Sequence, residues 1–264
     1  MQAAPPLSCN LQNVQHYKRT FRKSSRKNCR QLQQSKKWQK RGTRSNRHKQ
    51  HSMGDSLIAI KGKDYVLVAA DSGATRSILK MKENEDKIVA LDSSKLLAGS
   101  GPVGDRVQFS EYIQKNVKLY QFRNNIPLSN HAAANFIRTE LADALRSAPY
   151  QVNLLLAGFD KKGPALYWID YLAALQELDF ASQGYAGYFV SSILDRHYSK
   201  EMDFEEGLKL LRLCFKELQT RFVINTNTWF VKVVDKDGVR TVIEVEENGA
   251  EVRLDEKAKE KMED

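Results

Sequence analysis

The chain has 264 residues and a formal net charge of +10, but this charge is concentrated at one end. Residues 1–52 contain seven Lys, seven Arg and no acidic residue, so residues 53–264 carry a net charge of −4. The high isoelectric point therefore does not indicate a basic folded body that binds nucleic acid. No stretch reaches the roughly 18–20 consecutive apolar residues of a membrane-spanning helix, and we expect no membrane association.

The basic segment, residues 1–52, is rich in Gln, Asn, Ser, Lys and Arg and has few aliphatic residues. Such a composition buries too little apolar surface to offset the entropy of ordering, so we predict a disordered extension. Our leading interpretation is that Met53 starts the mature protein and that residues 1–52 are absent from it. A solvated tail contacting acidic surfaces or nucleic acid, a mitochondrial-type transit peptide and a removable pro-segment stay open.

Short apolar stretches begin the body. Strands are predicted over residues 56–61 and 65–71, and again over residues 87–91 and 95–99, where Asp-Ser-Ser at 92–94 favours a hairpin turn. Because tight turns connect the strands of each pair, we expect antiparallel pairing.

Two helices follow. The first is predicted over residues 103–122 and ends before Pro127, which disfavours helical angles in the residue preceding it. Its apolar residues recur at i, i+4 and i+7: Ile113, Val117 and Tyr120. The second starts with Ser129 or Asn130 as its cap and ends before Pro149. Its core stripe is formed by Ile137, Leu141 and Leu145.

The second half repeats this order. Strands are predicted over residues 152–157 and 165–170, followed by helices near 185–197 and 204–220. The core stripe of the last helix contains Leu211, Phe215, Leu218 and Phe222. A final hairpin joins residues 228–234 to 241–245 through Asp-Lys-Asp-Gly at 235–238.

Blocks of antiparallel strands alternating with pairs of helices predict an α+β fold. We expect a four-layer αββα sandwich, with two antiparallel sheets between helix layers. The predicted boundaries are a basic extension at 1–52, one domain at 53–252 and a charged tail at 253–264. A body of 212 residues is large enough to bury a core without disulfides.

The cysteines and histidines indicate neither a disulfide framework nor a metal site. Cys9 and Cys29 lie in the basic segment, whereas Cys214 lies among Leu and Phe residues of the last predicted helix. We therefore predict a buried, inert thiol at Cys214, a reducing compartment, and neither a metal nor another cofactor.

Several motifs, in order and spacing, resemble those of proteasome beta subunits, which have the N-terminal nucleophile hydrolase fold. The resemblance covers residues 53–250. It rests on Val-Ala-Ala-Asp-Ser at 68–72, Asp-Lys-Ile at 86–88, Ala-Gly-Ser-Gly at 98–101, Ala-Gly-Phe-Asp at 157–160, Leu-Tyr-Trp-Ile-Asp at 166–170 and Leu-Asp-Arg at 194–196.

The resemblance implies a catalytic set from which one member is missing. Catalytic relatives use an N-terminal Thr as nucleophile, with an Asp and a Lys 16 and 32 positions later and a Gly-containing turn as oxyanion donor. Here Asp71 and Lys87 are in register and Gly101 lies in the turn, but Asp55 stands at the Thr position. These four positions are therefore interpreted as vestigial, and no catalytic residue is expected.

Three further family positions also differ. The catalytic members have a Ser, an Asp and a Ser there, in that order, whereas this chain has Tyr185, Phe222 and Asn225. An active hydrolase would need cleavage after Asp55, which would make Ser56 the nucleophile and shift its register by one. Read without the resemblance, Asp71 and Lys87 are an ion pair that orders the sheet ends.

The resemblance implies a non-catalytic structural subunit of the proteasome core particle, in the beta ring that encloses the chamber for ATP- and ubiquitin-dependent protein degradation. The expected partners are other beta subunits in a seven-membered ring, alpha-ring subunits, the facing beta ring and assembly chaperones. The expected location is the cytoplasm and nucleus. The alternatives are an amide hydrolase acting through Ser56 and a basic-tailed nucleic-acid-binding protein.

Overall fold

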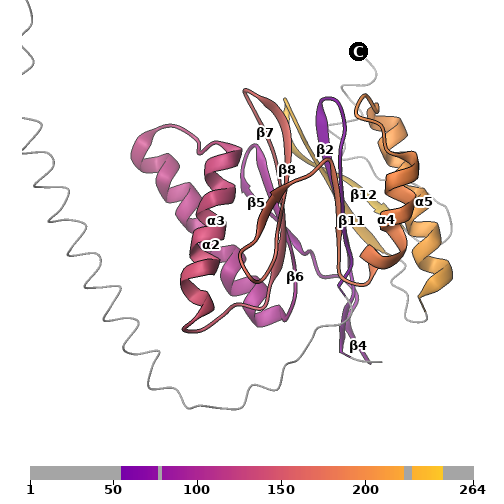
Figure 1. Ribbon diagram of the computed structural model, residues 1–264, viewed down its shortest axis with the longest axis horizontal. Helices are drawn as coiled ribbons and strands as arrows, with labels where there is room; N and C mark the ends of the chain where they lie inside the picture. The colour runs from indigo at the N-terminus through magenta and orange to yellow at the C-terminus, as the bar shows by residue number, and fades with distance from the viewer. Residues whose placement is uncertain (1–54, 77–78, 223–227, 246–264) are drawn as a thin grey trace, which may run out of the picture. The chain divides into compact units, whose positions relative to one another are not determined.

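The computed structural model describes residues 55–76, 79–222 and 228–245, all within one compact unit. Two antiparallel five-stranded sheets pack face to face, with two helices on each outer face (Figure 1). This arrangement confirms the predicted α+β fold of four layers. The predictions made for residues 1–52 and 253–264 lie outside the described residues.

The first sheet has the strand order β10-β1-β2-β11-β12, and all its neighbouring strands are antiparallel. Its strands are β1 (Leu57–Lys61), β2 (Tyr65–Asp71), β10 (Phe180–Gln183), β11 (Trp229–Asp235) and β12 (Gly238–Val245). The last two form the predicted hairpin, in which Asp235 lies opposite Gly238.

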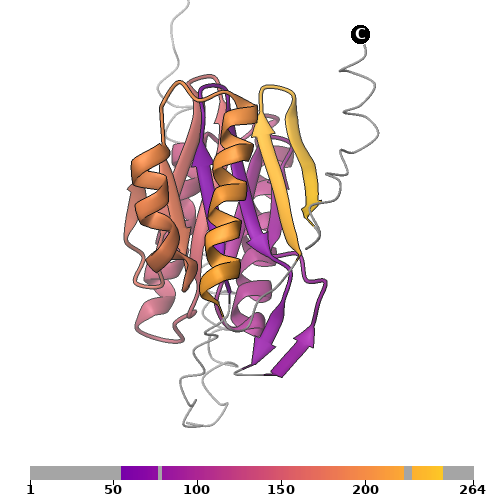
Figure 2. The same ribbon diagram turned by 90° about the vertical axis from the view of Figure 1, so that its right-hand side faces the viewer.

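The second sheet has the order β5-β6-β7-β8-β9 and is also antiparallel throughout. Its strands are β5 (Ile88–Asp92), β6 (Lys95–Ser100), β7 (Asn153–Asp160), β8 (Gly163–Ile169) and β9 (Leu175–Glu177). A separate ribbon, β3 (Ala74–Arg76) with β4 (Leu79–Lys82), lies beyond the ends of the large sheets (Figure 2).

Two helices cover each sheet. The helices are α2 (Val103–Asn124) and α3 (Asn130–Leu145) on the second sheet, and α4 (Ala186–His197) and α5 (Phe204–Arg221) on the first (Figures 1 and 2). The Ser129 side chain caps α3 by accepting a hydrogen bond from the Ala132 N–H at 3.2 Å, as predicted. None of the helices in the described part of the chain has both the length and the apolar character that crossing a bilayer requires.

Three apolar clusters fill the spaces between the four layers. The strands of both sheets are therefore buried on both faces. Along β1, Leu57 and Ala59 point between the sheets, whereas Ile58 and Ile60 pack under α4 and α5. Successive side chains of a strand point to opposite faces, so an almost continuous apolar run is expected for such a strand. The same apolar stretches that predicted strands are therefore also the ones expected of strands buried on both faces.

The structure differs from the prediction in several places, and Leu145, predicted in a core stripe, is only half-buried. The strands β3, β4, β9 and β10 were not predicted, since each has only three or four residues and no clear alternation. The turn predicted over residues 158–164 is shorter, because β7 and β8 continue to Asp160 and Gly163. Tyr120 was predicted in a core stripe but is 39% exposed, because it lines an open groove between α2 and α3.

Candidate functional site

Four strand ends meet at one end of the two sheets. Asp55 lies just before β1, and Asp71 is the last residue of β2. Lys87 lies just before β5, and Gly101 directly follows β6. Because both strand pairs are antiparallel, the start of one strand lies beside the end of its partner in each sheet. The topology thus brings together all four residues that the resemblance singles out.

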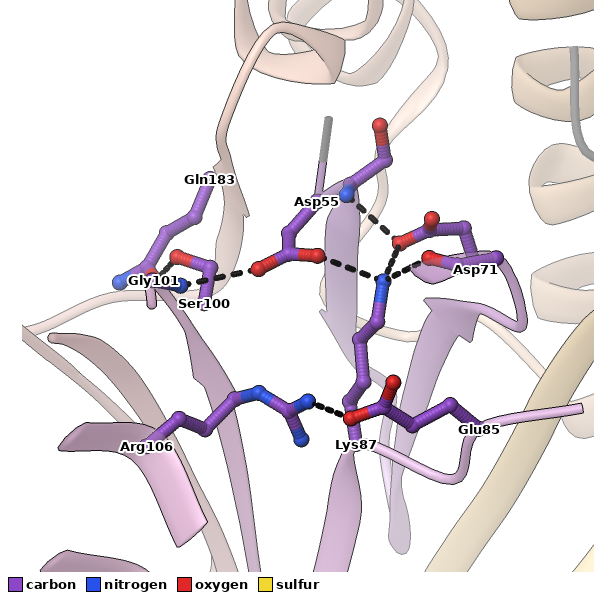
Figure 3. Close-up of polar contacts among 10 residues, drawn as sticks. Asp55, Asp71, Glu85, Lys87, Ser100, Gly101, Arg106 and Gln183 are labelled. Carbon is purple, nitrogen blue, oxygen red and sulfur yellow. Dashed lines mark hydrogen bonds and ion pairs between the residues drawn. The ribbon is translucent and has the colours of Figure 1, made fainter. Parts of the chain in front are cut away.

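These four residues form one connected polar network (Figure 3). The Lys87 Nζ atom lies 2.7 Å from Asp55 Oδ1. It also donates to Asp71 Oδ1 at 2.9 Å and to the Gly73 carbonyl oxygen at 2.8 Å. The Gly101 N–H donates to the other oxygen of Asp55, Oδ2, at 2.9 Å. Asp55 therefore joins the ammonium group to the backbone of the turn.

The network is almost completely removed from water. The side chains of Lys87, Asp71 and Asp55 are 0%, 3% and 11% exposed. Burial raises the pKa of Asp71 to about 6, and the charge of Asp55 adds to this rise, while Lys87 opposes it. Two carboxylates share one ammonium group, and protonation of Asp71 as the pH falls below about 6 relieves the excess of negative charge.

The position of the Gly101 N–H depends on residue 101 being a glycine. Its φ is +138°, and a Cβ atom there would lie 2.3 Å from the carbonyl oxygen of Gln151. No side chain fits at that distance, and few residues adopt that φ. Gly101 thus holds its N–H toward the carboxylate of Asp55 in a backbone geometry that other residues would disrupt.

A second glycine, Gly184, lies close against the backbone of Asp55. Its φ is +75°, and a Cβ atom would lie only 1.8 Å from the Asp55 carbonyl oxygen. The sequence analysis did not identify Gly184. Its position directly before the predicted helix near 185 was a weak signal for a tight backbone contact.

Three further polar contacts lie next to the network and were also missed, and Figure 3 shows two of them, Ser100 with Gln183 and Arg106 with Glu85. Ser100 Oγ donates to Gln183 Oε1 at 3.3 Å, and Gln183 Nε2 donates to the Leu154 carbonyl oxygen at 2.9 Å. Arg106 of α2 forms an ion pair with Glu85. These contacts join residues far apart in the chain, so no local pattern could have indicated them.

Of the remaining predicted positions, Tyr185 and Phe222 take part in aromatic contacts of their own. Tyr185 is 39% exposed, and its ring contacts that of Tyr188. The ring of Phe222 packs edge-on against Phe189 in the helix layer. Asn225 lies outside the described residues.

Ser56 is 2% exposed and lies directly before β1, where its backbone is bonded to Asp71 at the end of β2. Its N–H donates to Asp71 Oδ1 at 2.7 Å, and its carbonyl oxygen accepts from the Asp71 N–H at 3.1 Å. Since alternate residues of extended backbone face opposite sides, Ser56 points away from the side to which Asp55 points.

The predicted burial of Cys214 is confirmed. Cys214 is fully buried in the cluster under α4 and α5, and burial raises the pKa of its thiol to about 12. Such a thiol is protonated and unreactive at neutral pH. Within residues 55–76, 79–222 and 228–245, no group of three or more His, Cys, Asp or Glu side chains could hold a metal ion.

The arrangement supplies two of the components of an acyl-transfer site but no nucleophilic hydroxyl. The Lys87 ammonium and the Gly101 N–H are donors of the type that stabilise an alkoxide and an oxyanion. In this structure both donors contact carboxylate oxygens of Asp55.

Comparisons with known proteins agree with the fold and with the family resemblance. The family described as Proteasome subunit matches residues 51–234. Proteasome subunit beta type-2-B of Arabidopsis thaliana is 53% identical over 187 residues, which cover 70% of this chain and 94% of that protein.

Two further relatives give the same result. Proteasome subunit beta type-2 of Dictyostelium discoideum is 49% identical over 192 residues, covering 71% of this chain and 96% of that protein. Proteasome subunit beta type-4 of Saccharomyces cerevisiae is 44% identical over 191 residues, again covering 71% of this chain and 96% of that protein. The chain therefore belongs to the proteasome subunit family.

Proposed function

We propose that this chain is a non-catalytic structural beta subunit of the proteasome core particle. It contributes to the beta ring that encloses the chamber in which other subunits hydrolyse proteins delivered by ATP- and ubiquitin-dependent degradation. Family membership supports the place in the ring. The contact of Asp55 with Lys87 and Gly101, at the position of the nucleophile, supports the absence of activity.

The chemistry of a carboxylate supports this proposal. Attack of the Asp55 carboxylate on a peptide carbonyl would form an anhydride, which is far more reactive than the amide it replaces. The carboxylate is also held by the ammonium group and the N–H that would otherwise stabilise the transition state. The chain thus keeps the scaffold of the site and lacks a group able to start the reaction.

The hydrolase alternative through Ser56 is disfavoured by the same geometry. The side chain of Ser56 is buried, and its N–H is bonded to Asp71. Release of a new N-terminus there would place the hydroxyl on the opposite side of the strand from Lys87. The nucleic-acid alternative depends on residues 1–52, because residues 53–264 carry a net charge of −4.

Exposed apolar side chains on the outer helices support assembly with neighbours. Phe122 of α2 and Tyr188 of α4 are each 81% exposed, and these helices lie in the two opposite outer layers (Figure 1). Exposed apolar patches often mark protein interfaces, and Leu119, Tyr120 and Ile126 are also exposed on or beside α2. We expect these partners to be beta subunits of a seven-membered ring, alpha-ring subunits and the facing beta ring, with assembly chaperones acting beforehand.

The test is to isolate the chain through a C-terminal tag and treat the intact assembly with an electrophilic probe for N-terminal Thr and Ser nucleophiles. We expect a large complex of related subunits, in the cytoplasm and nucleus, in which other subunits are labelled and this chain is not. Labelling of this chain at Ser56 would refute the proposal. Recovery of the chain without related subunits would also refute it.

The same preparation tests the extent of the chain. We expect an intact mass that corresponds to a start at Met53 or Gly54. Retention of residues 1–52, together with salt-sensitive binding of nucleic acid, would favour the nucleic-acid alternative instead.

A further inference from the structure

The outer edge of β12 has no neighbouring strand in the described part of the chain. This eight-residue strand is the last in the order β10-β1-β2-β11-β12, and Figure 2 shows it in yellow at the margin of the sheet. Its residues Arg240 and Thr241 are exposed. An edge strand with open backbone groups is a place where a further strand can pair.

The hydrogen bonds of β11 show which backbone groups of β12 point outward. The Thr228 carbonyl oxygen accepts from the Ser72 N–H at 3.1 Å, so Thr228 directs its backbone groups toward β2. In an antiparallel sheet successive residues direct these groups to opposite sides. Trp229 therefore directs its groups to β12, where it pairs with Val245. It follows that Glu244 directs its N–H and C=O away from β11, to the open edge.

A β-bulge limits the part of this edge that a regular strand can use. The partners of Val231 and Lys232 in β12 are Ile243 and Thr241, so Val242 is an extra residue. A bulge bends its strand and interrupts the ladder. A new strand therefore finds regular backbone from Ile243 onward, in the direction in which the chain continues.

The sequence that follows β12 has the pattern of a hairpin. Asn248-Gly249 is among the strongest short turn signals. It is followed by Ala-Glu-Val-Arg-Leu at 250–254, whose alternation is typical of a half-buried strand. Asp255 begins a charged stretch without this alternation. The pattern predicts a strand over 250–254 that runs back along β12.

We propose that residues 250–254 of this chain pair with the open edge of β12 as a sixth antiparallel strand of the first sheet. A turn centred on residues 248 and 249 sets the register, in which the paired residues are Val245 with Val252, Glu244 with Arg253 and Ile243 with Leu254. Two pairs are apolar and one joins opposite charges, and such pairs contribute about 0.2–1 kcal/mol each.

The same register satisfies the outward backbone groups of Glu244, which exchange hydrogen bonds with Arg253. Glu246 and Glu251 then form the next hydrogen-bonded pair, which closes a four-residue loop of a common hairpin type. Their like charges oppose each other, and this is the one unfavourable pair. The three favourable pairs outnumber it.

The occupant belongs to this chain because of where the segment begins. Residues 246–264 start directly at the end of β12, so the pairing strand is held at a high effective concentration beside the edge. A strand from another chain must compete with it. Closure of this edge from within prevents sheet-to-sheet association there, and leaves the outer helices for contacts in the ring. The pairing depends only on contacts within this chain, so it goes beyond the proposed role in the ring.

The first test is oxidative cross-linking of the full chain in its tagged assembly, with Cys9→Ser and Cys29→Ser as background. Val245→Cys with Val252→Cys places two thiols at directly opposite positions, where the Cα atoms are close enough for a disulfide. The control, Val245→Cys with Glu251→Cys, has a similar separation in the chain but places the thiols on opposite faces. We expect the first pair to form an intrachain disulfide about tenfold faster, because only its geometry fits the bond.

The second test is amide hydrogen exchange at Glu244 in the same assembly without cysteine substitutions. Val252→Ser with Leu254→Ser weakens the added strand, so the Glu244 N–H should exchange about tenfold faster, the equivalent of one hydrogen bond. The matched control is Ala258→Ser with Met262→Ser, which lies beyond the strand and should leave the exchange of Glu244 unchanged.

Equal cross-linking rates in the two cysteine pairs would overturn the proposal, as would unchanged exchange at Glu244 in the Val252→Ser, Leu254→Ser variant. A disulfide between two chains would show that another copy occupies the edge, and would overturn it too. If the cysteine variants do not enter the assembly, the isolated full chain is oxidised, and the proposal requires the same difference in rate there. None of these outcomes alters the labelling test of the proposed function.

Discussion

Replacement of Lys87 by Met tests whether the buried network is held by its single cation. Met fills a similar volume but removes the ammonium group, which leaves the carboxylates of Asp55 and Asp71 buried without a counter-ion. Removing one partner of a buried ion pair typically destabilises a protein by about 3–5 kcal/mol. Both carboxylates are at most 11% exposed, so solvent offers little relief.

Protonation limits this loss and makes it depend on pH. A pH of 7 is about three units above the ordinary Asp pKa of 3.8. Protonating one carboxyl group at pH 7 therefore costs about 4 kcal/mol. We expect Lys87→Met to lower the free energy of unfolding by about 3–4 kcal/mol at pH 7. The loss should shrink as the pH falls from 7 toward 6, but by less than about 1.4 kcal/mol, because Asp71 of wild type also binds a proton as the pH falls through about 6.

The assay is urea unfolding of the full chain at pH 5, 6 and 7, with Lys115→Met as the control. Lys115 pairs only with Glu111 on the exposed surface of α2, where its side chain is 72% exposed, so its loss should cost under about 1 kcal/mol at every pH. A loss for Lys87→Met that is as small as the control, or that does not change with pH, would refute this account of the network.

Three other substitutions give separate tests. The raised pKa of Asp71, about 6 against 3.8, means that its contribution to stability is fully present below pH 3.8 and is lost as pH rises through 6. Urea unfolding should therefore show wild type losing about 2.4 kcal/mol relative to Asp71→Asn between pH 4 and pH 7.5, and parallel curves would contradict this. Gly184→Ala should cost at least about 2 kcal/mol of unfolding free energy, because its Cβ would lie 1.8 Å from the Asp55 carbonyl oxygen. The control is Gly104→Ala, which has open space around it and should be neutral or slightly stabilising in a thermal melt. Phe122→Ser should leave the melting temperature of the isolated chain nearly unchanged but reduce its recovery with other subunits in a tagged pull-down, and unchanged recovery would contradict a partner on that face.

The sequence predicted the layers of the fold because the strands are buried on both faces. The run at residues 65–71 is apolar up to its last residue, and all of its residues are buried between two cores. The short strands could not be predicted in the same way. The three residues of β9 and the four of β10 are strands because β8 and β1 lie beside them, and this pairing is set by the tertiary fold.

The candidate site was predicted in part. The spacing of Asp55, Asp71 and Lys87 placed three residues in register with a known family, and the structure brings their side chains into contact. The direction of the Gly101 N–H could not be predicted, since it follows from a φ of +138° that packing imposes. Gly184 was missed for a similar reason, because its role depends on a backbone atom that is distant in sequence.

The network also bears on how the molecule unfolds. Asp55 and Asp71 belong to the first sheet, whereas Lys87 and Gly101 belong to the second. Separation of the sheets would leave a charged group without its partner before water could fully reach it. Partial opening between the sheets is therefore unfavourable, and both should unfold in one cooperative step. The network of Asp55, Asp71, Lys87 and Gly101, which contains no nucleophile, thus helps to hold the two sheets together.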